Sequence, residues 1–309
     1  GFRPGRSAHQ AVAKAQSYLR EGYGFVVDLD LEKFFDRVNH DKLMSSLAER
    51  VEDKRVLKLI RAFLNVGVME GGLVKPTEEG TPQGGPLSPF LSNIVLDELD
   101  KELEKRGHRF ARYADDCNVY VRSERAGHRV MESLRRFITE RLKLKVNESK
   151  SAVARPQERK FLSLSFTSGK EPNRRKIAPQ AIARFKTKVR VLTNKNRGKS
   201  VEQVVEDLSS YLPGWVGYFG YCETPKVFAE LDAWIRRRFR CLIWRQWGTF
   251  RRRRAELLAL GRCEAEAVKA ALSSRGPWTM SHVATIQRAL NNAYFDSIGL
   301  PKLVELRNI

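Results

Sequence analysis

The sequence predicts an α+β fold in its first half, an antiparallel sheet with helices on one face, followed by a basic helical domain. Two observations predict the sheet: short β-prone runs alternate with amphipathic stretches, and two of these runs, RFARYA and CNVYVRS, are close enough to form a hairpin. A third observation predicts the helical domain, because from about Pro172 the chain becomes basic and helical in pattern. We expect domains at 1–170 and 171–255, and a helical tail at 256–309.

The first predicted strand begins at Phe25 in GFVVDLDLEKFF, and strand alternation puts Asp28 and Asp30 on one face. A helix should follow with Asn39 as its N-cap. The next stretch, DKRVLKLIRAFLNVG, predicts a helix that ends at Gly67. The apolar positions that recur at helical spacing in these two helices are Leu43, Leu47, Val51, Val56, Leu59, Ile60 and Phe63.

A loop rich in glycine and proline, GTPQGGP, precedes the next predicted helix. Ser88 is its expected N-cap, with Pro89 at the first helical position, and Gly107 its expected stop. After the hairpin comes an amphipathic helix, and LKLKVNESKS and RKFLSLSFTS predict further short strands. The expected buried face of that helix consists of Val130, Leu134, Phe137, Ile138 and Leu142.

Composition is ordinary for a globular protein, with 42% hydrophobic residues, no apolar run long enough to cross a bilayer and no recognisable signal peptide. The four cysteines lie far apart without zinc-finger spacing, so we expect neither zinc nor a disulfide framework. No membrane partner is expected, and the protein should be cytoplasmic in a bacterium or organellar in a eukaryote. Because the chain begins at Gly1 without a methionine, we expect a fragment that lacks its natural N-terminus.

Charge is the strongest compositional signal. The formal net charge is +21, and in residues 155–254 Lys and Arg outnumber Asp and Glu three to one, interleaved with aromatic residues. Solubility alone needs no such excess, so the pattern favours a nucleic-acid partner over a merely solvated surface. In FAELDAWIRRRFRCLIWRQW the apolar positions recur at helical spacing, while Arg236, Arg237, Arg240 and Arg245 spread over other faces. We expect Arg236, Arg237, Arg240 and Arg245 to bind nucleic acid, and the tail to contact DNA or RNA.

Adjacent carboxylates, Asp115 and Asp116, stand where the two hairpin strands meet, although aspartate is a poor strand former and like charges repel. A hard divalent cation such as Mg²⁺ prefers oxygen ligands, and two such ions about 4 Å apart can assist phosphoryl transfer. Asp30, at the end of a buried-type strand, completes a candidate triad if the strands are neighbours. The residues alone therefore predict a metal-dependent phosphoryl-transfer site, against the alternative of a solvated turn.

At this point the motifs resemble a known family. YADD at 113–116 is similar to the signature turn of reverse transcriptases, DLEKFFDRVNHDKL to their first catalytic motif, and GTPQGGPLSPFLSNIVLDELD to the loop and helix at the nascent base pair. GFRPGRSAHQAV and YLPGWVGYFGYCETPKVFAELDAWIRRRFRCLIWRQW resemble segments of group II intron-encoded proteins. The resemblance implies a polymerase palm with partial fingers at 1–170, and a basic helical thumb or maturase (X) domain at 171–255.

The resemblance also implies roles for single residues. Asp30, Asp115, Asp116 and the backbone carbonyl of Leu31 would hold two Mg²⁺ ions, with Mn²⁺ as a substitute, and Asp28 would support the fold. Phe35 would lie under the incoming sugar and disfavour ribonucleotides, although the bland alternative is an ordinary core phenylalanine. The other residues implied to contact the nucleotide are Gln83, Gly84 and Lys150. Ser163 stands where the family usually has glycine in its primer-grip turn.

The implied function is RNA-directed DNA polymerisation with dNTPs on an RNA template and DNA primer, together with binding of intron RNA to assist splicing. A non-catalytic RNA-binding maturase is the alternative from another class, and retron-associated or CRISPR-associated reverse transcriptases are related alternatives. The intact set of carboxylates favours the polymerase, because a pure binder gains nothing from clustered acids that face RNA phosphates. The sequence does not determine an oligomeric state.

Overall fold

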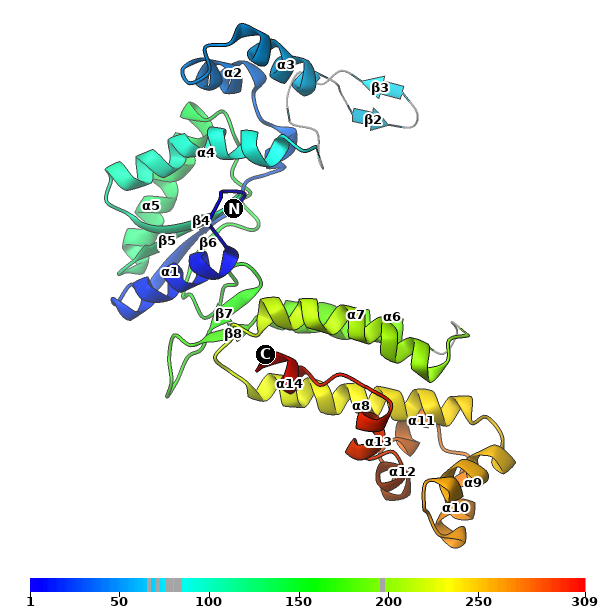
Figure 1. The fold of residues 1–309 in the computed structure, drawn as a ribbon. Coiled ribbons are helices and arrows are strands. Elements are labelled where there is room, and N and C mark those ends of the chain that lie inside the picture. The colour runs from blue at the N-terminus through cyan, green and yellow to red at the C-terminus, as the bar shows by residue number, and fades with distance from the viewer. Residues whose placement is uncertain (66–67, 71–72, 76–79, 81–84, 195–197, 309) are drawn as a thin grey trace. The chain divides into compact units, whose positions relative to one another are not determined.

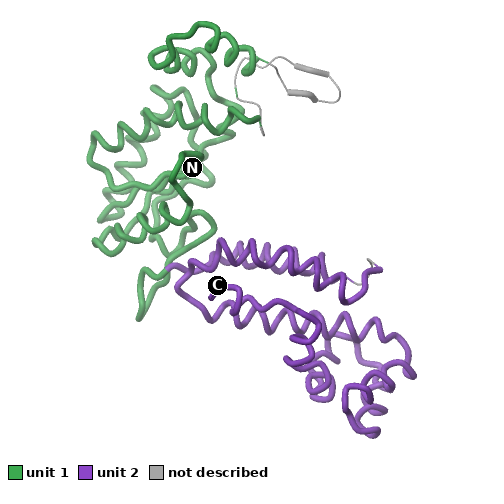
Figure 2. The backbone as a smooth tube through the Cα atoms, in the orientation of Figure 1, with its two compact units in different colours: residues 1–174 green, residues 175–309 purple. Residues whose placement is uncertain are grey.

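The computed structural model describes residues 1–65, 68–70, 73–75, 80, 85–194 and 198–308. The chain divides into two compact units, Gly1–Arg174 and Arg175–Ile309 (Figure 2). Across the described residues, no helix has both the length and the apolar character needed to span a bilayer.

The first unit is built on a four-stranded antiparallel sheet with the strand order β4-β5-β1-β6 (Figure 1). Its strands are β1 (Phe25–Leu29), β4 (Arg109–Tyr113), β5 (Asp116–Val121) and β6 (Ala152–Ala154). The central pair aligns Val27 with Val119 and Asp28 with Asn118. The predicted hairpin and the predicted first strand are therefore confirmed.

Helices α4 (Ser88–Lys105) and α5 (Glu124–Arg136) pack on one face of this sheet and form the core of the unit. Val27, Leu29 and Val119 point into that core, because alternate side chains of a strand point to the same face. The prediction of an α+β fold with an antiparallel sheet backed by helices is confirmed. The structure adds α1 (Ala8–Arg20) at the β4 edge of the other face, where the rings of Tyr18 and Tyr120 lie 5.6 Å apart.

Helix boundaries agree with the sequence in part. Asn39 caps α2 (His40–Ala48) by accepting a hydrogen bond from the Lys42 amide, as predicted. Gly107, with φ +69°, follows α4 in a Schellman arrangement in which its own amide and that of the next residue donate back to the last turn. The predicted N-cap Ser88 is wrong by one position: it is the first residue of α4 and is buried, and Leu87 precedes it.

Two other stretches differ from the expectation. LKLKVNESKS forms only a single bridge, between Leu31 and Val146, and α5 continues into a π-helical turn, η2 (Phe137–Arg141). The apolar stripe of α3 (Lys54–Asn65) is only half covered, since Val56 and Leu59 are exposed, whereas Ile60 and Phe63 pack against the core. The expected stop at Gly67 lies outside the described residues. The remaining elements of this unit are η1 (Phe34–Asp36), β2 (Val68–Glu70), β3 (Leu73–Lys75) and β7 (Leu164–Phe166).

The second unit is helical after one short strand, which confirms the prediction of a helical second part. An aromatic core joins its three long helices, because the Trp215 ring on α7 lies 4.3 Å from Phe185 on α6 and 5.9 Å from Phe228 on α8. The buried Asp232 of α8 accepts hydrogen bonds from the Leu303 and Val304 amides and so holds the start of α14. The elements are β8 (Arg175–Ile177), α6 (Pro179–Leu192), α7 (Val201–Phe219), α8 (Lys226–Gln246), α9 (Phe250–Ala259), α10 (Glu264–Ala271), α11 (Pro277–Met280), α12 (Ala284–Ala289), α13 (Asn292–Ser297) and α14 (Leu303–Arg307).

A tight turn precedes β7. Phe161 and Leu164 exchange both backbone hydrogen bonds, and the two residues between them, Leu162 and Ser163, have φ of +52° and +63°. Positive φ at both central positions is the type I′ pattern, for which glycine and asparagine are the usual residues. The structure thus gives a physical reason for glycine at the position that Ser163 occupies.

We expect Ser163→Gly to raise the free energy of unfolding by about 0.5–1 kcal/mol, because glycine removes left-handed strain that exceeds its own entropic cost. Urea denaturation followed by circular dichroism measures the change. The matched control Ser165→Gly removes a buried hydroxyl that donates to two backbone carbonyls, and should lower stability instead. A destabilised Ser163→Gly variant would mean that the side chain matters more than the backbone strain.

Candidate active site and nucleic-acid interface

The end of β1 lies beside the hairpin turn that carries the paired carboxylates. Leu29 is opposite Cys117, so one further residue along the same register sets Asp30 opposite Asp116. The backbone of Asp30 is held on both sides, since its amide donates to Ser151 Oγ at 3.0 Å and its carbonyl accepts from the Asn147 amide at 2.8 Å. The fold therefore brings together Asp30, Asp115 and Asp116, the three acids that the sequence singled out.

The turn between β4 and β5 is strained. Only two residues, Ala114 and Asp115, link the paired positions Tyr113 and Asp116, and Ala114 has φ +57°, where glycine is the usual residue. Strain of this kind persists only where surrounding contacts fix the backbone. Here Arg112 supplies such a contact, because its Nη1 donates to the Ala114 carbonyl at 2.7 Å.

Arg112 is itself anchored by a buried ion pair. Its Nε and Nη2 donate to the two carboxylate oxygens of Asp100 on α4 at 2.6 and 2.5 Å, and 4% of its side chain is exposed. Burial disfavours the guanidinium charge, but the hydrogen bonds and the negative charge of Asp100 outweigh that cost and raise the pKa of Arg112. No local sequence pattern marks Arg112, because its anchor, Asp100, lies on another element.

Asp28 is neutralised by protein partners rather than left open. Arg159 donates to its Oδ2 from Nε at 2.8 Å and lies within 2.6 Å through Nη2. With the Asn118 amide oriented as its neighbours require, the Asn118 nitrogen donates to Asp28 Oδ1 at 2.9 Å. Burial raises the pKa of Asp28 in spite of these partners. Such a saturated carboxylate suits a structural role next to the triad.

Asp116 carries the most perturbed carboxyl of the cluster. Although part of the side chain remains exposed to solvent, removal of water by the surrounding protein raises its pKa to about 6, and the charges of Asp115, Asp28 and Asp30 act in the same direction. Lys160 opposes the shift only weakly. An ionised Asp116 at neutral pH is therefore a charge that the protein leaves poorly compensated, and a cation would stabilise it.

The donor chemistry fits a hard divalent cation, since the cluster offers carboxylate oxygens and a backbone carbonyl. The Asp30 carbonyl accepts from the Asn147 amide, and the Glu32 amide donates to the Lys145 carbonyl. The Leu31 carbonyl belongs to the same peptide unit as the Glu32 amide and therefore points away from residues 145–147. Within the described ranges, no three His, Cys, Asp or Glu side chains already surround one point closely enough to hold a metal. Asp30 Oδ2 lies 3.7 Å from Lys150 Nζ, and 32% of the Asp30 side chain is exposed.

The residues expected to contact the nucleotide are placed unevenly. Phe35, in η1, is half-buried and its ring packs edge-on at 5.2 Å against the buried Phe34. Gln83 and Gly84 lie outside the described residues. Lys150 is beside Asp30, as stated above, with 68% of its side chain exposed.

The start of the glycine-rich loop is anchored to the first catalytic motif. Gly80, with φ +95°, donates its amide to the Val38 carbonyl at 2.8 Å, and a Cβ at this position would lie 3.0 Å from the Asp36 backbone. The buried His40 ring bonds the Gly80 carbonyl through Nε2. Only glycine fits this close approach without a shift of the backbone. His40 and Gly80 thus fix the start of this loop, and no local sequence pattern marks either residue.

The four arginines of α8 that were predicted to bind nucleic acid have different environments. The Arg237 guanidinium lies 3.5 Å from the centre of the Trp278 ring, and Arg240 donates to the Leu290 carbonyl at 2.9 Å, so both contact the C-terminal helices. Arg236 is half-buried, whereas Arg245 is exposed. A basic aromatic patch that the sequence did not predict lies nearby, where Lys186 and Arg190 of α6 are both 5.7 Å from the Trp234 ring.

Comparison with protein families identifies both parts of the chain. Residues 1–166 match the family described as reverse transcriptase (RNA-dependent DNA polymerase). Residues 182–258 match the maturase-specific domain of group II introns. The first match covers the sheet, the carboxylates and α4, and the second covers α7 and α8 and most of α6 and α9.

Curated relatives agree with these matches. Protein YkfC of Escherichia coli K12 is 30% identical over 191 residues, which cover 50% of each chain. The group II intron-encoded protein LtrA of Lactococcus lactis is 41% identical over 103 residues, which cover 33% of this chain and 17% of the relative. The retron Ec86 reverse transcriptase of Escherichia coli is 26% identical over 178 residues, 55% of this chain and 50% of the relative. The chain thus spans about half the length of these relatives or less.

With its carboxylates gathered at the end of β1 and on the β4–β5 turn, and with both family matches in sequence order, the chain belongs to the reverse transcriptase family and carries a group II intron maturase-specific domain.

Proposed function

We propose that the protein is the RNA-directed DNA polymerase of a group II intron, which extends a DNA primer with dNTPs on an RNA template. The observation that carries the proposal is that the Leu29–Cys117 pair brings the neighbouring Asp30 and Asp116 close enough for their charges to interact, with Asp115 on a turn that Arg112 fixes. A protein that only binds RNA would gain nothing from clustered acids when burial, together with their mutual repulsion, raises the pKa of Asp116. The maturase-specific match supports the intron type over the retron type.

The mechanism assigns each residue a role in phosphoryl transfer. Asp30, Asp115, Asp116 and the Leu31 carbonyl are the groups that would hold two Mg²⁺ ions, and these ions would polarise the attacking hydroxyl and stabilise the leaving oxygen. The primer 3′-hydroxyl loses its proton to solvent as its oxygen forms a bond to the α-phosphorus of the dNTP, and the bond from that phosphorus to the bridging oxygen breaks so that pyrophosphate leaves. Lys150 lies near enough to Asp30 to neutralise phosphate charge and to donate a proton to the pyrophosphate.

The neighbouring backbone holds the nucleotide. Phe35 would lie under the sugar, and the loop that starts at Gly80 would carry Gln83 and Gly84 to the base pair. Because Gly80 is bonded to Val38 and His40, Gly80 itself is held at a fixed spacing from residues 38–40.

A second activity, binding of intron RNA to assist splicing, follows from the basic helical unit. Its match to the maturase-specific domain and its excess of Lys and Arg support this role. The proposed domains are the palm with partial fingers at 1–170, the thumb or maturase domain at 171–255, and the tail at 256–309 that contacts nucleic acid.

Asp115→Asn should abolish polymerisation, because an amide oxygen is a much weaker ligand for Mg²⁺ than a carboxylate. We expect the rate of primer extension on an RNA template by the full-length protein to fall by about 10³-fold or more. Asp53→Asn, which changes an exposed carboxylate outside the site, is the charge-matched control. Equal activity of the Asp115→Asn variant and the wild type would refute the proposed site.

Asp116→Asn should stabilise the metal-free protein while it weakens the response to Mg²⁺. Because the folded-state pKa is raised to about 6, ionisation of Asp116 opposes folding above that pH, and a neutral amide removes the cost. After allowance for solvent screening, we expect a gain of about 1 kcal/mol in the free energy of unfolding.

Differential scanning calorimetry in metal-free buffer, well above pH 6, followed by titration with Mg²⁺, measures both effects. Mg²⁺ should raise the melting temperature of the wild type and raise that of the variant less. A variant that is destabilised without metal, or that responds to Mg²⁺ as the wild type does, would contradict the proposed role of Asp116.

Phe35→Ala should relax selection against ribonucleotides, because the ring that would clash with a 2′-hydroxyl is removed. The ratio of kcat/KM for an rNTP to that for the matching dNTP should rise by about 10- to 100-fold. Phe35→Tyr keeps the ring and should keep the selection. An unchanged ratio in the alanine variant would assign Phe35 to the core with Phe34.

A further inference from the structure

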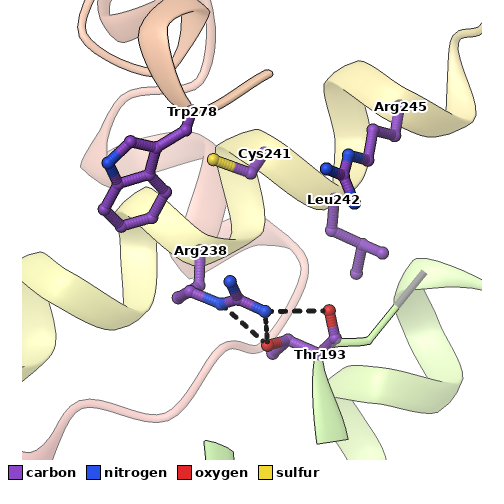
Figure 3. A pocket seen from close by; sticks show the side chains of 6 residues that line it. All are labelled: Thr193, Arg238, Cys241, Leu242, Arg245 and Trp278. Atoms are coloured by element: carbon purple, nitrogen blue, oxygen red, sulfur yellow. Dashed lines mark hydrogen bonds between the residues drawn. The ribbon is translucent and has the colours of Figure 1, made fainter. Parts of the chain in front are cut away.

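The second unit contains a cavity of about 230 Å³ that the proposed polymerase mechanism does not use. Its walls are formed by the C-terminal end of α6, one face of α8 and the short helix α11 (Figure 3). The lining residues are Thr193, Arg238, Cys241, Leu242, Arg245 and Trp278.

One side of the cavity is cationic. Arg238 donates to the Thr193 hydroxyl from Nε at 3.1 Å and from Nη2 at 3.0 Å, which fixes its guanidinium against the end of α6 (Figure 3). No carboxylate in the described part of the chain forms an ion pair with Arg238 or Arg245. Burial lowers the pKa of Arg238, and the positive charges of Arg190 and Arg245 lower it further. An anion in this cavity would therefore meet uncompensated positive charge.

The other side of the cavity is aromatic and apolar. Trp278 is 43% exposed, and the Arg237 guanidinium stacks on its ring with Cζ 3.5 Å from the ring centre. Arg237 also donates to the Ser281 hydroxyl at 3.3 Å, and that hydroxyl donates to the Trp278 carbonyl at 2.6 Å. Arg237 itself does not line the cavity, whereas Trp278 does. Trp278 is thus an anchored aromatic residue that is partly exposed at the cavity wall.

The size of the cavity restricts its ligand. Sites that enclose a whole drug-sized molecule occupy about 300–1,000 Å³, so this cavity suits one part of a larger, partly exposed ligand. A flat apolar surface opposite two guanidinium groups fits a flat ring joined to an anion. Single-stranded nucleic acid offers this combination at every residue, as a base and a phosphate.

We propose that this cavity binds one unpaired nucleotide of RNA, with the base stacked on Trp278 and its phosphate bound by Arg245 and Arg238. The inference rests on the proposed binding of intron RNA by the same unit, and it adds that the recognised RNA is single-stranded at this point. A base within a duplex is stacked on both faces and cannot reach the indole, whereas duplex phosphates can still bind the basic surface.

The test measures binding of the full-length protein to a fluorescent single-stranded oligouridylate and to an RNA duplex of equal length, at several salt concentrations. We expect Trp278→Ala to weaken binding of the single strand by about 5- to 100-fold and to change duplex binding little. Arg245→Gln should weaken single-strand binding and lower the slope of log K against log salt by about one. Trp278→Phe keeps a stacking surface and should restore most of the affinity.

Phe250→Ala is the matched control, because Phe250 is also an exposed aromatic residue of this unit, 41% exposed, and does not line the cavity. A Trp278→Ala variant that melts at the wild-type temperature and binds oligouridylate normally would overturn the cavity proposal alone. Equal losses for single strand and duplex would also overturn it, since they would indicate a structural role. If the wild type binds neither RNA, the proposed RNA-binding function fails as well.

Discussion

The buried ion pair between Arg112 and Asp100 is the interaction on which the candidate active site depends. The hairpin turn combines an alanine at positive φ with two adjacent carboxylates, and each feature alone opposes folding. Arg112 offsets these costs by joining the turn, through the Ala114 carbonyl, to α4 and hence to the core of the unit. Removing one partner of such a pair leaves a buried charge uncompensated, so the arrangement tolerates little change. The strained turn therefore keeps its conformation only while α4 holds Asp100 in place.

Much of the fold could be predicted from sequence because local patterns and tertiary packing agree. The strand at Phe25, the hairpin, the Asn39 cap and the Gly107 stop all follow from residue type and spacing. The position of α1 on the second face of the sheet could not be predicted, because α1 packs there through contacts between residues distant in sequence. Exposure of Leu59 could not be predicted either, because periodicity identifies an apolar stripe and does not reveal what covers it.

The residues of the candidate site also fall into those that could be predicted from sequence and those that could not. The carboxylates were identifiable because acids at strand ends are unusual, and the register then places Asp30 opposite Asp116. Arg112, Arg159 and His40 were not identified, since each depends on a partner on another element, Asp100, Asp28 and Gly80 respectively, that no local pattern reveals. For the arginines of α8, the sequence revealed the charge but not the contacts of each side chain. A basic helix was evident, but Arg237 and Arg240 contact the C-terminal helices, whereas Trp278 and Arg238 form a cavity that depends on three separate elements.

The central claim is that the end of β1 and the β4–β5 turn form one cation site for nucleotide transfer. Anomalous diffraction from crystals of the full-length protein with Mn²⁺ and a non-hydrolysable dNTP analogue tests it most directly, because Mn²⁺ can be located by its own scattering. We predict anomalous peaks about 2.2 Å from carboxylate oxygens of Asp30 and Asp115, with the analogue's phosphates as further ligands. Nucleotide bound without Mn²⁺ at these carboxylates, or Mn²⁺ bound only elsewhere, would contradict the account.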